Sequence, residues 1–213
     1  FFLNLFNEVA KEFEKENDQN FREYIKQRFE FDRAERTSFL QAYLYNLLDT
    51  QVTIFEYKNK LLSIKEDNSD IHLRIFGVLS AIYIQKIIFI ELCKLFNIDE
   101  RDSTIRKINS MKAVRLRNII AAHTVNFKRG DKKNQNFTHF KIKYEHHEDD
   151  IVKIFDEENK NESFCINQVI DDFHSHIEDL FLKIVSNALG KLYKENNNKL
   201  KLELNRLNGL SKK

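Results

Sequence analysis

The chain of 213 residues contains no proline and only four glycines. Because proline and glycine interrupt helices and form most tight turns, their scarcity predicts long, uninterrupted helices. Cysteine occurs only twice, and the two residues, Cys93 and Cys165, are far apart in the sequence. Such a pair makes neither a disulfide framework nor a thiolate metal site, which favours a reducing, cytoplasmic location. We therefore expect a helical cytoplasmic protein that buries one sizeable core.

An excess of charge of one sign is also lacking. The 35 lysines and arginines are nearly balanced by 33 aspartates and glutamates, for a formal net charge of +2. This balance excludes a chain-wide attraction for nucleic acid, so any such site has to be a local patch. The sequence has no glycine-rich phosphate loop, no GxSxG elbow and no HExxH. Their absence argues against nucleotide hydrolases, esterases and metalloproteases.

A charge-free hydrophobic run long enough to span a membrane is missing as well. The most apolar segment, Ile75–Leu95, is interrupted by Gln85, Lys86, Glu91 and Lys94. A transmembrane helix needs about 20 residues with few or no charges. We therefore predict a core helix here and no contact with a membrane. No signal-peptide pattern is found in the sequence.

Apolar residues recur at spacings of three, four and seven over most of the chain, as on one face of a helix. This period predicts helices over 3–17, 21–31, 35–65, 71–96, 104–123 and 167–195. Asn68-Ser69-Asp70 is expected to cap the fourth of these, and a kink is expected at Asn109-Ser110. The tail over 200–210 fits either a strand or an amphipathic helix.

Between two of these helices the period changes to two residues. Phe140, Ile142 and Tyr144 alternate with charged residues, and 151–155 and 163–166 are further strand candidates. We therefore predict an all-α fold, an antiparallel helical bundle with a small β-hairpin or three-stranded insertion before the last long helix. The single predicted domain comprises N-terminal helices (1–34), bundle helices (35–127), the β insertion (137–166), the last long helix (167–195) and a tail (196–213).

The segment Arg117-Asn118-Ile119-Ile120-Ala121-Ala122-His123 combines groups that can cut RNA without a metal. RNA carries its own nucleophile, the 2′-hydroxyl, so an enzyme has to supply proton transfer and charge stabilisation around one phosphate. Histidine suits proton transfer. The planar guanidinium of arginine binds two phosphate oxygens at once and suits charge stabilisation. Asn118 could hold a phosphate oxygen or fix the histidine tautomer.

This segment resembles the signature of the HEPN superfamily, small helical-bundle proteins whose active members are metal-independent endoribonucleases. The signature is an arginine, four to six residues and a histidine, with a polar residue often after the arginine. Here Arg117 and His123 enclose five residues, and Asn118 takes the polar place. The resemblance covers about residues 35–193 and assigns roles to these three positions alone. The β insertion departs from the simplest plan of the family and leaves substrate choice open.

The resemblance implies a homodimer that pairs two motifs across a cleft. Helical geometry leaves three arrangements open, because six positions on an ideal helix turn by about 600° and leave the side chains of Arg117 and His123 about 120° apart. Either the helix loosens before His123, or the arginine side chain wraps round, or a second copy completes the site. Many relatives of this type act in toxin–antitoxin or abortive-infection defence, which implies a cognate antitoxin or regulatory protein as a further partner.

Further RNA contacts are expected around the motif. Arg115, Thr124 and Asn126 are candidates, with a solvated charge and turn or cap roles as their alternatives. Downstream, a basic loop would steer RNA by neutralising phosphate charge, unless it is simply a solvated loop. Its candidate residues are Lys128, Arg129, Lys132 and Lys133. For the motif itself, the alternative is a helix-end histidine bonded to a carbonyl and an arginine paired with a surface carboxylate.

No metal and no cofactor are expected. His139, His146 and His147 lie near four acidic residues, but adjacent turn residues rarely converge on one ion, so a polar hairpin loop is predicted. His174 and His176 are expected to face different sides of one helix.

We predict a metal-independent endoribonuclease that acts on RNA as a cytoplasmic homodimer in a toxin or antiphage-defence system. One alternative is a non-catalytic bundle that dimerises and binds RNA, a nucleotide or a protein. Another is a purely structural helical protein.

Overall fold

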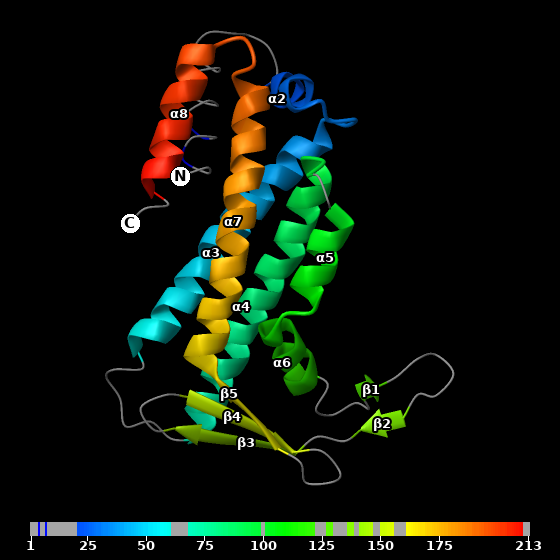
Figure 1. Ribbon diagram of the computed structural model, residues 1–213, viewed down its shortest axis with the longest axis vertical. Coiled ribbons are helices and arrows are strands. Elements are labelled where there is room, and N and C mark those ends of the chain that lie inside the picture. Colours follow the sequence, from blue (N-terminus) through cyan, green and yellow to red (C-terminus); the bar gives the residue numbers. More distant parts are fainter. Residues whose placement is uncertain are drawn as a thin grey trace. The chain divides into compact units, whose positions relative to one another are not determined.

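The computed structural model describes residues 21–60, 68–98, 101–121, 127–129, 136–138, 141–146, 150–155 and 161–210, together with Asn4 and Asn7. The helices in this part of the chain are α2 (Phe21–Phe29), α3 (Glu35–Lys60), α4 (Asn68–Leu95), α5 (Arg101–Asn109), α6 (Lys112–Ala121), α7 (Ile166–Leu192) and α8 (Asn197–Leu210). The strands are β1 (Phe127–Arg129), β2 (Asn136–Thr138), β3 (Lys141–His146), β4 (Asp150–Phe155) and β5 (Asn161–Cys165) (Figure 1). The predominance of helix is confirmed, and the predicted helix over 3–17 lies outside the described residues apart from Asn4 and Asn7.

The chain divides into two compact units. The first comprises Phe1–Leu48, Ile87–Ser103 and Ile177–Lys213, and the second comprises Asp49–Lys86 and Thr104–His176. The long helices α3, α4 and α7 each contribute residues to both units. The antiparallel bundle and its likeness to HEPN proteins stay predictions.

An aromatic cluster lies in the core of the first unit. The ring centroid of Phe29, at the end of α2, is 5.3 Å from that of Phe96 in an edge-to-face arrangement. Phe31 is 5.4 Å from Phe29 and 6.1 Å from Phe96. Both Phe29 and Phe96 are 1% exposed, so the cluster adds directional ring contacts to the burial of apolar surface. It therefore joins the chain just after α4 to the end of α2.

Both of these helices end in a left-handed residue that is not glycine. Glu30 follows α2 with φ of 57°, and Asn97 lies beyond α4 with φ of 50°. The N–H of Phe31 donates to the carbonyl of Lys26 at 2.8 Å, and the N–H of Glu30 donates to that of Gln27 at 3.2 Å. This pair of bonds is the Schellman motif, and α4 ends with the same pair. As a result α2 ends two residues before the predicted position.

We expect the substitution Glu30→Gly to stabilise the folded protein by about 0.5–1 kcal/mol, because glycine adopts a positive φ without the steric cost that a Cβ brings. The substitution also removes an ion pair with Lys191, whose nitrogen lies 3.5 Å from the Glu30 carboxylate. Glu30 is largely exposed, so that loss is small. Glu30→Ala is the control, since it removes the same carboxylate and keeps the strain. Urea unfolding measures both variants, and equal midpoints would contradict the expectation.

The kink predicted at Asn109-Ser110 is a complete break, so the segment predicted as one helix over 104–123 is two helices. α5 ends at Asn109, and Ser110 and Met111 separate it from α6. The hydroxyl of Ser110 donates to the carbonyl of Lys107 at 2.8 Å, and the N–H of Ser110 also reaches that carbonyl at 3.2 Å. These bonds satisfy the last turn of α5 and let the chain change direction. α5 also begins at Arg101, earlier than predicted.

The predicted three-stranded antiparallel sheet is confirmed. β4 pairs with β3 on one side and with β5 on the other, which places Val152 opposite both Tyr144 and Phe164. Val152 and Phe164 are buried, so one face of the sheet contributes side chains to the core. Figure 1 shows the three strands side by side, with β5 leading directly into α7. His146 pairs with Asp150, as expected of a hairpin, while residues 147–149 lie outside the described part of the chain.

A second, two-stranded sheet was not predicted. β1 pairs with β2 in antiparallel fashion, with Phe127 opposite Thr138. Lys128 and Arg129, which were assigned to a basic loop, are therefore strand residues. Three-residue strands are too short to show a two-residue period, and this explains why the sequence pattern did not reveal them.

Two helix starts also differ from the sequence prediction. α4 begins at Asn68, so Asn68-Ser69-Asp70 forms its first turn and not its cap. The tail, which fitted either a strand or a helix, is the helix α8. Asn196 caps its start, because the Asn196 side-chain oxygen accepts a hydrogen bond from the N–H of Lys199 at 3.0 Å. Within α4, residues His72–Leu95 are long and apolar enough to cross a membrane, with a mean hydropathy of 1.8. Half of the most apolar 18-residue stretch of this segment is buried inside the protein, and the core helices of globular proteins are often as long and as apolar.

Candidate functional site

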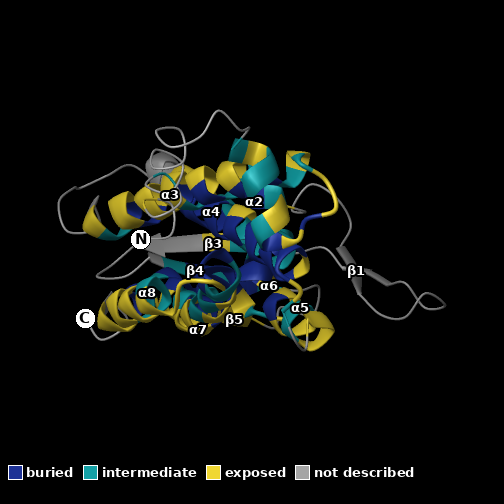
Figure 2. Cartoon of the chain, turned by 90° about the horizontal axis from the view of Figure 1, so that it is seen from above, coloured by how far each residue is buried: buried dark blue, intermediate teal, exposed yellow. Residues whose placement is uncertain are grey.

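Helix α6 places Arg117 at the edge of its buried face. Figure 2 shows α6 largely in the dark blue of buried residues. Arg117 lies four residues after Ala113 and three before Ile120, both of which are buried. Residues at these spacings share one face of a helix, so the arginine side chain leaves the backbone on the buried side. Arg117 and Asn118 are accordingly half-buried, in contrast to the exposed Arg115.

The guanidinium of Arg117 is held by an aromatic ring and an amide. Its central carbon lies 3.8 Å from the ring centroid of Tyr83 on α4, a close cation–π contact. Its Nη1 donates to Oδ1 of Asn118 at 3.4 Å. The Nε atom is buried and has no hydrogen-bond partner among the described residues. The group is thus fixed in position while retaining N–H donors for another acceptor.

A second cation shares the same ring. The ammonium of Lys86 lies 4.7 Å from the centroid of Tyr83, and both Tyr83 and Lys86 are half-buried. No carboxylate in the described part of the chain forms an ion pair with Arg117 or Lys86. Two cations gathered on one ring repel each other and attract an anion. Arg117, Asn118, Tyr83 and Lys86 together therefore form a site suited to a phosphate, which we call the Tyr83 site.

Sequence reasoning did not find Tyr83 or Lys86. Lys86 was noted only as an interruption of an apolar helix, and Tyr83 was not singled out. The available signal was a lysine three residues after a tyrosine in the middle of the most apolar segment, which places both on one helix face. The ammonium of Lys86 lies on the Tyr83 ring and forms no ion pair with a described carboxylate, which leaves its charge available to an anion.

Arg115 differs from Arg117 in its partners. Its Nη1 and Nη2 lie 2.8 and 2.7 Å from the two carboxylate oxygens of Glu162 on β5, a two-pronged ion pair. Both side chains are nearly half exposed, so the pair contributes little to stability. It nevertheless occupies the terminal nitrogens that would bind phosphate. Of the two arginines of α6, Arg117 is the one whose terminal nitrogens pair with no described carboxylate.

The other predicted contacts are only partly covered by the structure. His123, Thr124, Asn126, Lys132 and Lys133 lie outside the described residues. Lys128 and Arg129 are on β1, paired with Phe137 and Asn136 respectively. Their roles, and that of His123 above all, stay predictions.

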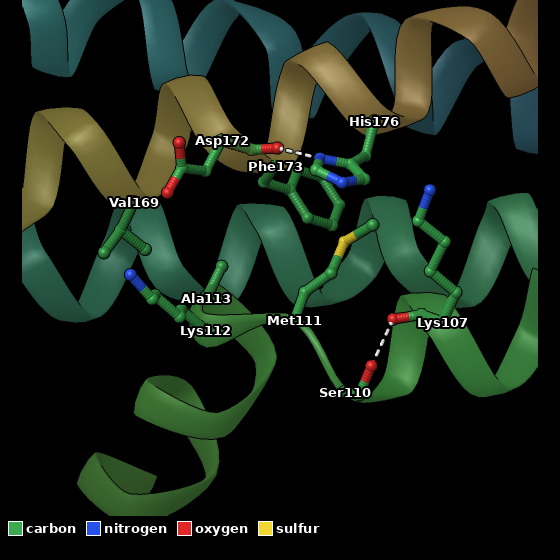
Figure 3. Close-up of a pocket in the computed structure, with 9 residues that line it drawn as sticks. All are labelled: Lys107, Ser110, Met111, Lys112, Ala113, Val169, Asp172, Phe173 and His176. Atoms are coloured by element: carbon green, nitrogen blue, oxygen red, sulfur yellow. Dashed lines mark hydrogen bonds between the residues drawn. The ribbon is translucent and has the colours of Figure 1, made fainter.

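A pocket of about 420 Å³ opens in the second unit at the turn between α5 and α6. Its apolar wall is formed by Met111, Ala113, Val169 and Phe173. Its polar groups come from Lys107, Ser110, Lys112, Asp172 and His176. Figure 3 shows Lys107 and Lys112 on either side of Met111. The Nδ1 atom of His176 lies 2.8 Å from the carbonyl oxygen of Asp172, so Nδ1 carries the proton and Nε2 remains available.

The remaining histidine of α7 has a different environment. Burial lowers the pKa of His174, and the positive charge of Lys58 lowers it further. Lys58 itself forms an ion pair with Asp171. The Nε2 atom of His174 is buried and lacks a hydrogen-bond partner among the described residues. A neutral imidazole is therefore favoured at this position.

Thiol and metal chemistry find little support in the described residues. Burial raises the pKa of Cys93 to about 11, so this thiol is protonated at neutral pH and is a poor nucleophile. Cys165 is a free, half-buried cysteine. No cluster of three or more His, Cys, Asp or Glu side chains that could hold a metal is found within the described ranges.

No protein-family model matches the chain, and neither the curated proteins nor the solved structures contain a match. A function therefore has to be inferred from the chemistry of the side chains in this chain.

Proposed function

We propose that the chain is a metal-independent endoribonuclease that acts on RNA as a homodimer. The observation that carries the proposal is the guanidinium of Arg117, which is fixed on Tyr83 beside Lys86 and forms no ion pair with a described carboxylate. A positioned cation of this kind is what a phosphate with developing negative charge requires. The HEPN-like signature adds a histidine six residues later, at His123.

The reaction follows from the chemistry of RNA. The 2′-oxygen attacks the adjacent phosphorus while a base takes the 2′-hydroxyl proton. The bond from phosphorus to the 5′-oxygen breaks, and an acid gives that oxygen a proton. In this scheme Arg117 stabilises the charge on the phosphoryl oxygens, His123 transfers protons, and Asn118 orients the guanidinium or the substrate. The products are a 2′,3′-cyclic phosphate and a 5′-hydroxyl.

Two copies are part of this scheme, because on an ideal helix the side chains of Arg117 and His123 would point about 120° apart. Arg117 of one chain then acts with His123 of the partner subunit at one phosphate, and the same pairing recurs in a second, symmetry-related site. We propose a cytoplasmic toxin or antiphage-defence effector as the biological setting, with a cognate antitoxin or regulatory protein as a further partner. The resemblance to HEPN proteins supports this setting.

The proposal is tested by incubating the purified protein with single-stranded RNA in the presence of EDTA. We expect cleavage that persists in EDTA and leaves cyclic phosphate ends, and no cleavage where a 2′-deoxynucleotide replaces the nucleotide at the cut. Cleavage that stops in EDTA, or that leaves a 3′-hydroxyl and a 5′-phosphate, would contradict the mechanism. Binding without cleavage of any tested RNA would favour a non-catalytic binding module.

A further inference from the structure

The pocket at the turn between α5 and α6 has the groups of an anion site around an apolar wall. Lys107 and Lys112 bring two positive charges, against one carboxylate from Asp172. Neither lysine forms an ion pair with a described residue. The Nε2 atom of His176 adds a polar contact, because Nδ1 is already bonded to a backbone carbonyl. The local charge therefore favours an anionic ligand.

The start of α6 adds further donors at the edge of this pocket. Met111 occupies the N-cap position, since its carbonyl accepts from the N–H of Arg115 at 3.0 Å. Methionine has no side-chain oxygen to accept from the first-turn N–H groups. Among the described residues, no side chain accepts from the N–H of Lys112, Ala113 or Val114. The positive end of the helix dipole is thus left uncompensated where the two lysines lie.

We infer that this pocket binds one nucleotide of the RNA strand, next to the phosphate held at the Tyr83 site; the inference rests on the proposed function. Ala113 lines the pocket, and Arg117 lies four residues later on the same helix face, about 6 Å along the axis. One strand can therefore contact both places. Lys107 and Lys112, on either side of Met111, face the two phosphates that flank the nucleotide, and the base lies against Met111.

The shape and composition of the pocket fit a nucleotide better than a bare phosphate. A volume of about 420 Å³ is within the range of small-molecule sites and leaves room for a base beside the phosphate. The polarisable side chain of Met111 suits contact with an aromatic base. The Asp172 carboxylate repels phosphate but accepts hydrogen bonds from base N–H groups, which places the base on its side of the pocket.

The composition of the chain supplies a direct reporter, because Met111 is its single methionine. We expect the ¹³C-methyl NMR signal of Met111, identified by its loss in Met111→Leu, to shift and saturate when a 2′-O-methyl RNA oligonucleotide is added. Inorganic phosphate at the same concentration is expected to leave the signal in place. A signal that does not move with the oligonucleotide, or that moves as readily with phosphate, would overturn the inference.

A charge-matched pair of variants gives a second measurement, by fluorescence anisotropy of the same labelled oligonucleotide. We expect Lys107→Ala/Lys112→Ala to weaken binding about tenfold. The slope of the logarithm of affinity against the logarithm of salt concentration is expected to become less steep by about one unit. Lys183→Ala/Lys201→Ala removes two exposed lysines of the first unit and is expected to bind as the wild type does. Equal affinities of the two double variants would reject the pocket as the subsite.

The methylated oligonucleotide has no free 2′-hydroxyl and resists cleavage by the proposed reaction, so binding is measured separately from catalysis. A protein that cuts no RNA but shows a saturating Met111 shift retains the subsite and loses the proposed nuclease activity. A protein that cuts RNA while the Met111 signal stays in place retains the activity and loses the subsite.

Discussion

Replacing Arg117 by alanine is expected to lower the rate of RNA cleavage by about 10²–10³-fold, the usual effect of removing one positioned group that stabilises transition-state charge. The physical reason is the fixed guanidinium, stacked 3.8 Å from the ring centroid of Tyr83 and bonded to Asn118. Single-turnover cleavage of a defined RNA measures the loss. Most of the effect is expected on the rate of the chemical step, because the charge it stabilises develops only in the transition state.

Three further substitutions separate this role from charge alone. Arg117→Lys keeps the positive charge but loses the planar guanidinium that can bind two phosphate oxygens at once. We therefore expect its cleavage rate to lie between those of Arg117→Ala and the wild type. Arg115→Ala is expected to cost only a few-fold, because its terminal nitrogens are occupied by Glu162. Arg33→Ala removes an exposed arginine of the first unit and is expected to have no effect.

A structural explanation for the loss is checked by thermal unfolding. Removing the contact with Tyr83 is expected to destabilise the protein by about 0.5–2 kcal/mol, the range for cation–π pairs. A folded Arg117→Ala protein that cuts RNA at the wild-type rate would reject the site assignment. An equal loss in Arg115→Ala would show that net charge on α6, and not the position of Arg117, matters.

Periodicity was sufficient to locate most described helices, because each buries an apolar face that recurs every three or four residues. A kink at Asn109-Ser110 was predicted, but the full separation of α5 from α6 was not, because it depends on the hydroxyl of Ser110 reaching a backbone carbonyl. Neither Ser110 nor Met111 is a strong helix breaker, so the local sequence indicated a bend and not two separate helices. The left-handed ends at Glu30 and Asn97 escaped notice for a related reason, since such ends are usually marked by glycine.

The Tyr83 site shows where sequence reasoning reached its limit. Arg117 was found because its chemical partners in the motif are close in the sequence. Tyr83 and Lys86 lie on a different helix, and their contact with Arg117 depends on how α4 packs against α6 in the second unit. Because α4 is apolar on nearly all sides, its pattern does not indicate which face meets α6. The distinction between Arg115 and Arg117 likewise depends on β5, which brings Glu162 to only one of them.

The cleavage rate of a mixed dimer is expected to differ strongly from that of either variant homodimer. It tests whether each site is shared between two chains. We expect a heterodimer of one Arg117→Ala chain and one His123→Ala chain to cut RNA at about half the wild-type rate, although each variant homodimer is nearly inactive. In this heterodimer one site retains Arg117 of one subunit and His123 of the partner subunit, while the other site loses both. Co-expression with two different affinity tags and tandem purification isolates the heterodimer for the cleavage assay.

The reciprocal heterodimer makes this result decisive. When one chain carries both substitutions and the other is wild type, each shared site loses one of its two groups, so we expect almost no cleavage. If instead each chain supplied its own Arg117 and His123, the wild-type chain would retain a complete site and the same heterodimer would keep about half of the activity. The two arrangements therefore predict opposite rankings of the same two proteins, each with two substitutions per dimer. A ranking that favours the heterodimer with one doubly substituted chain would show that Arg117 and His123 act together within one chain.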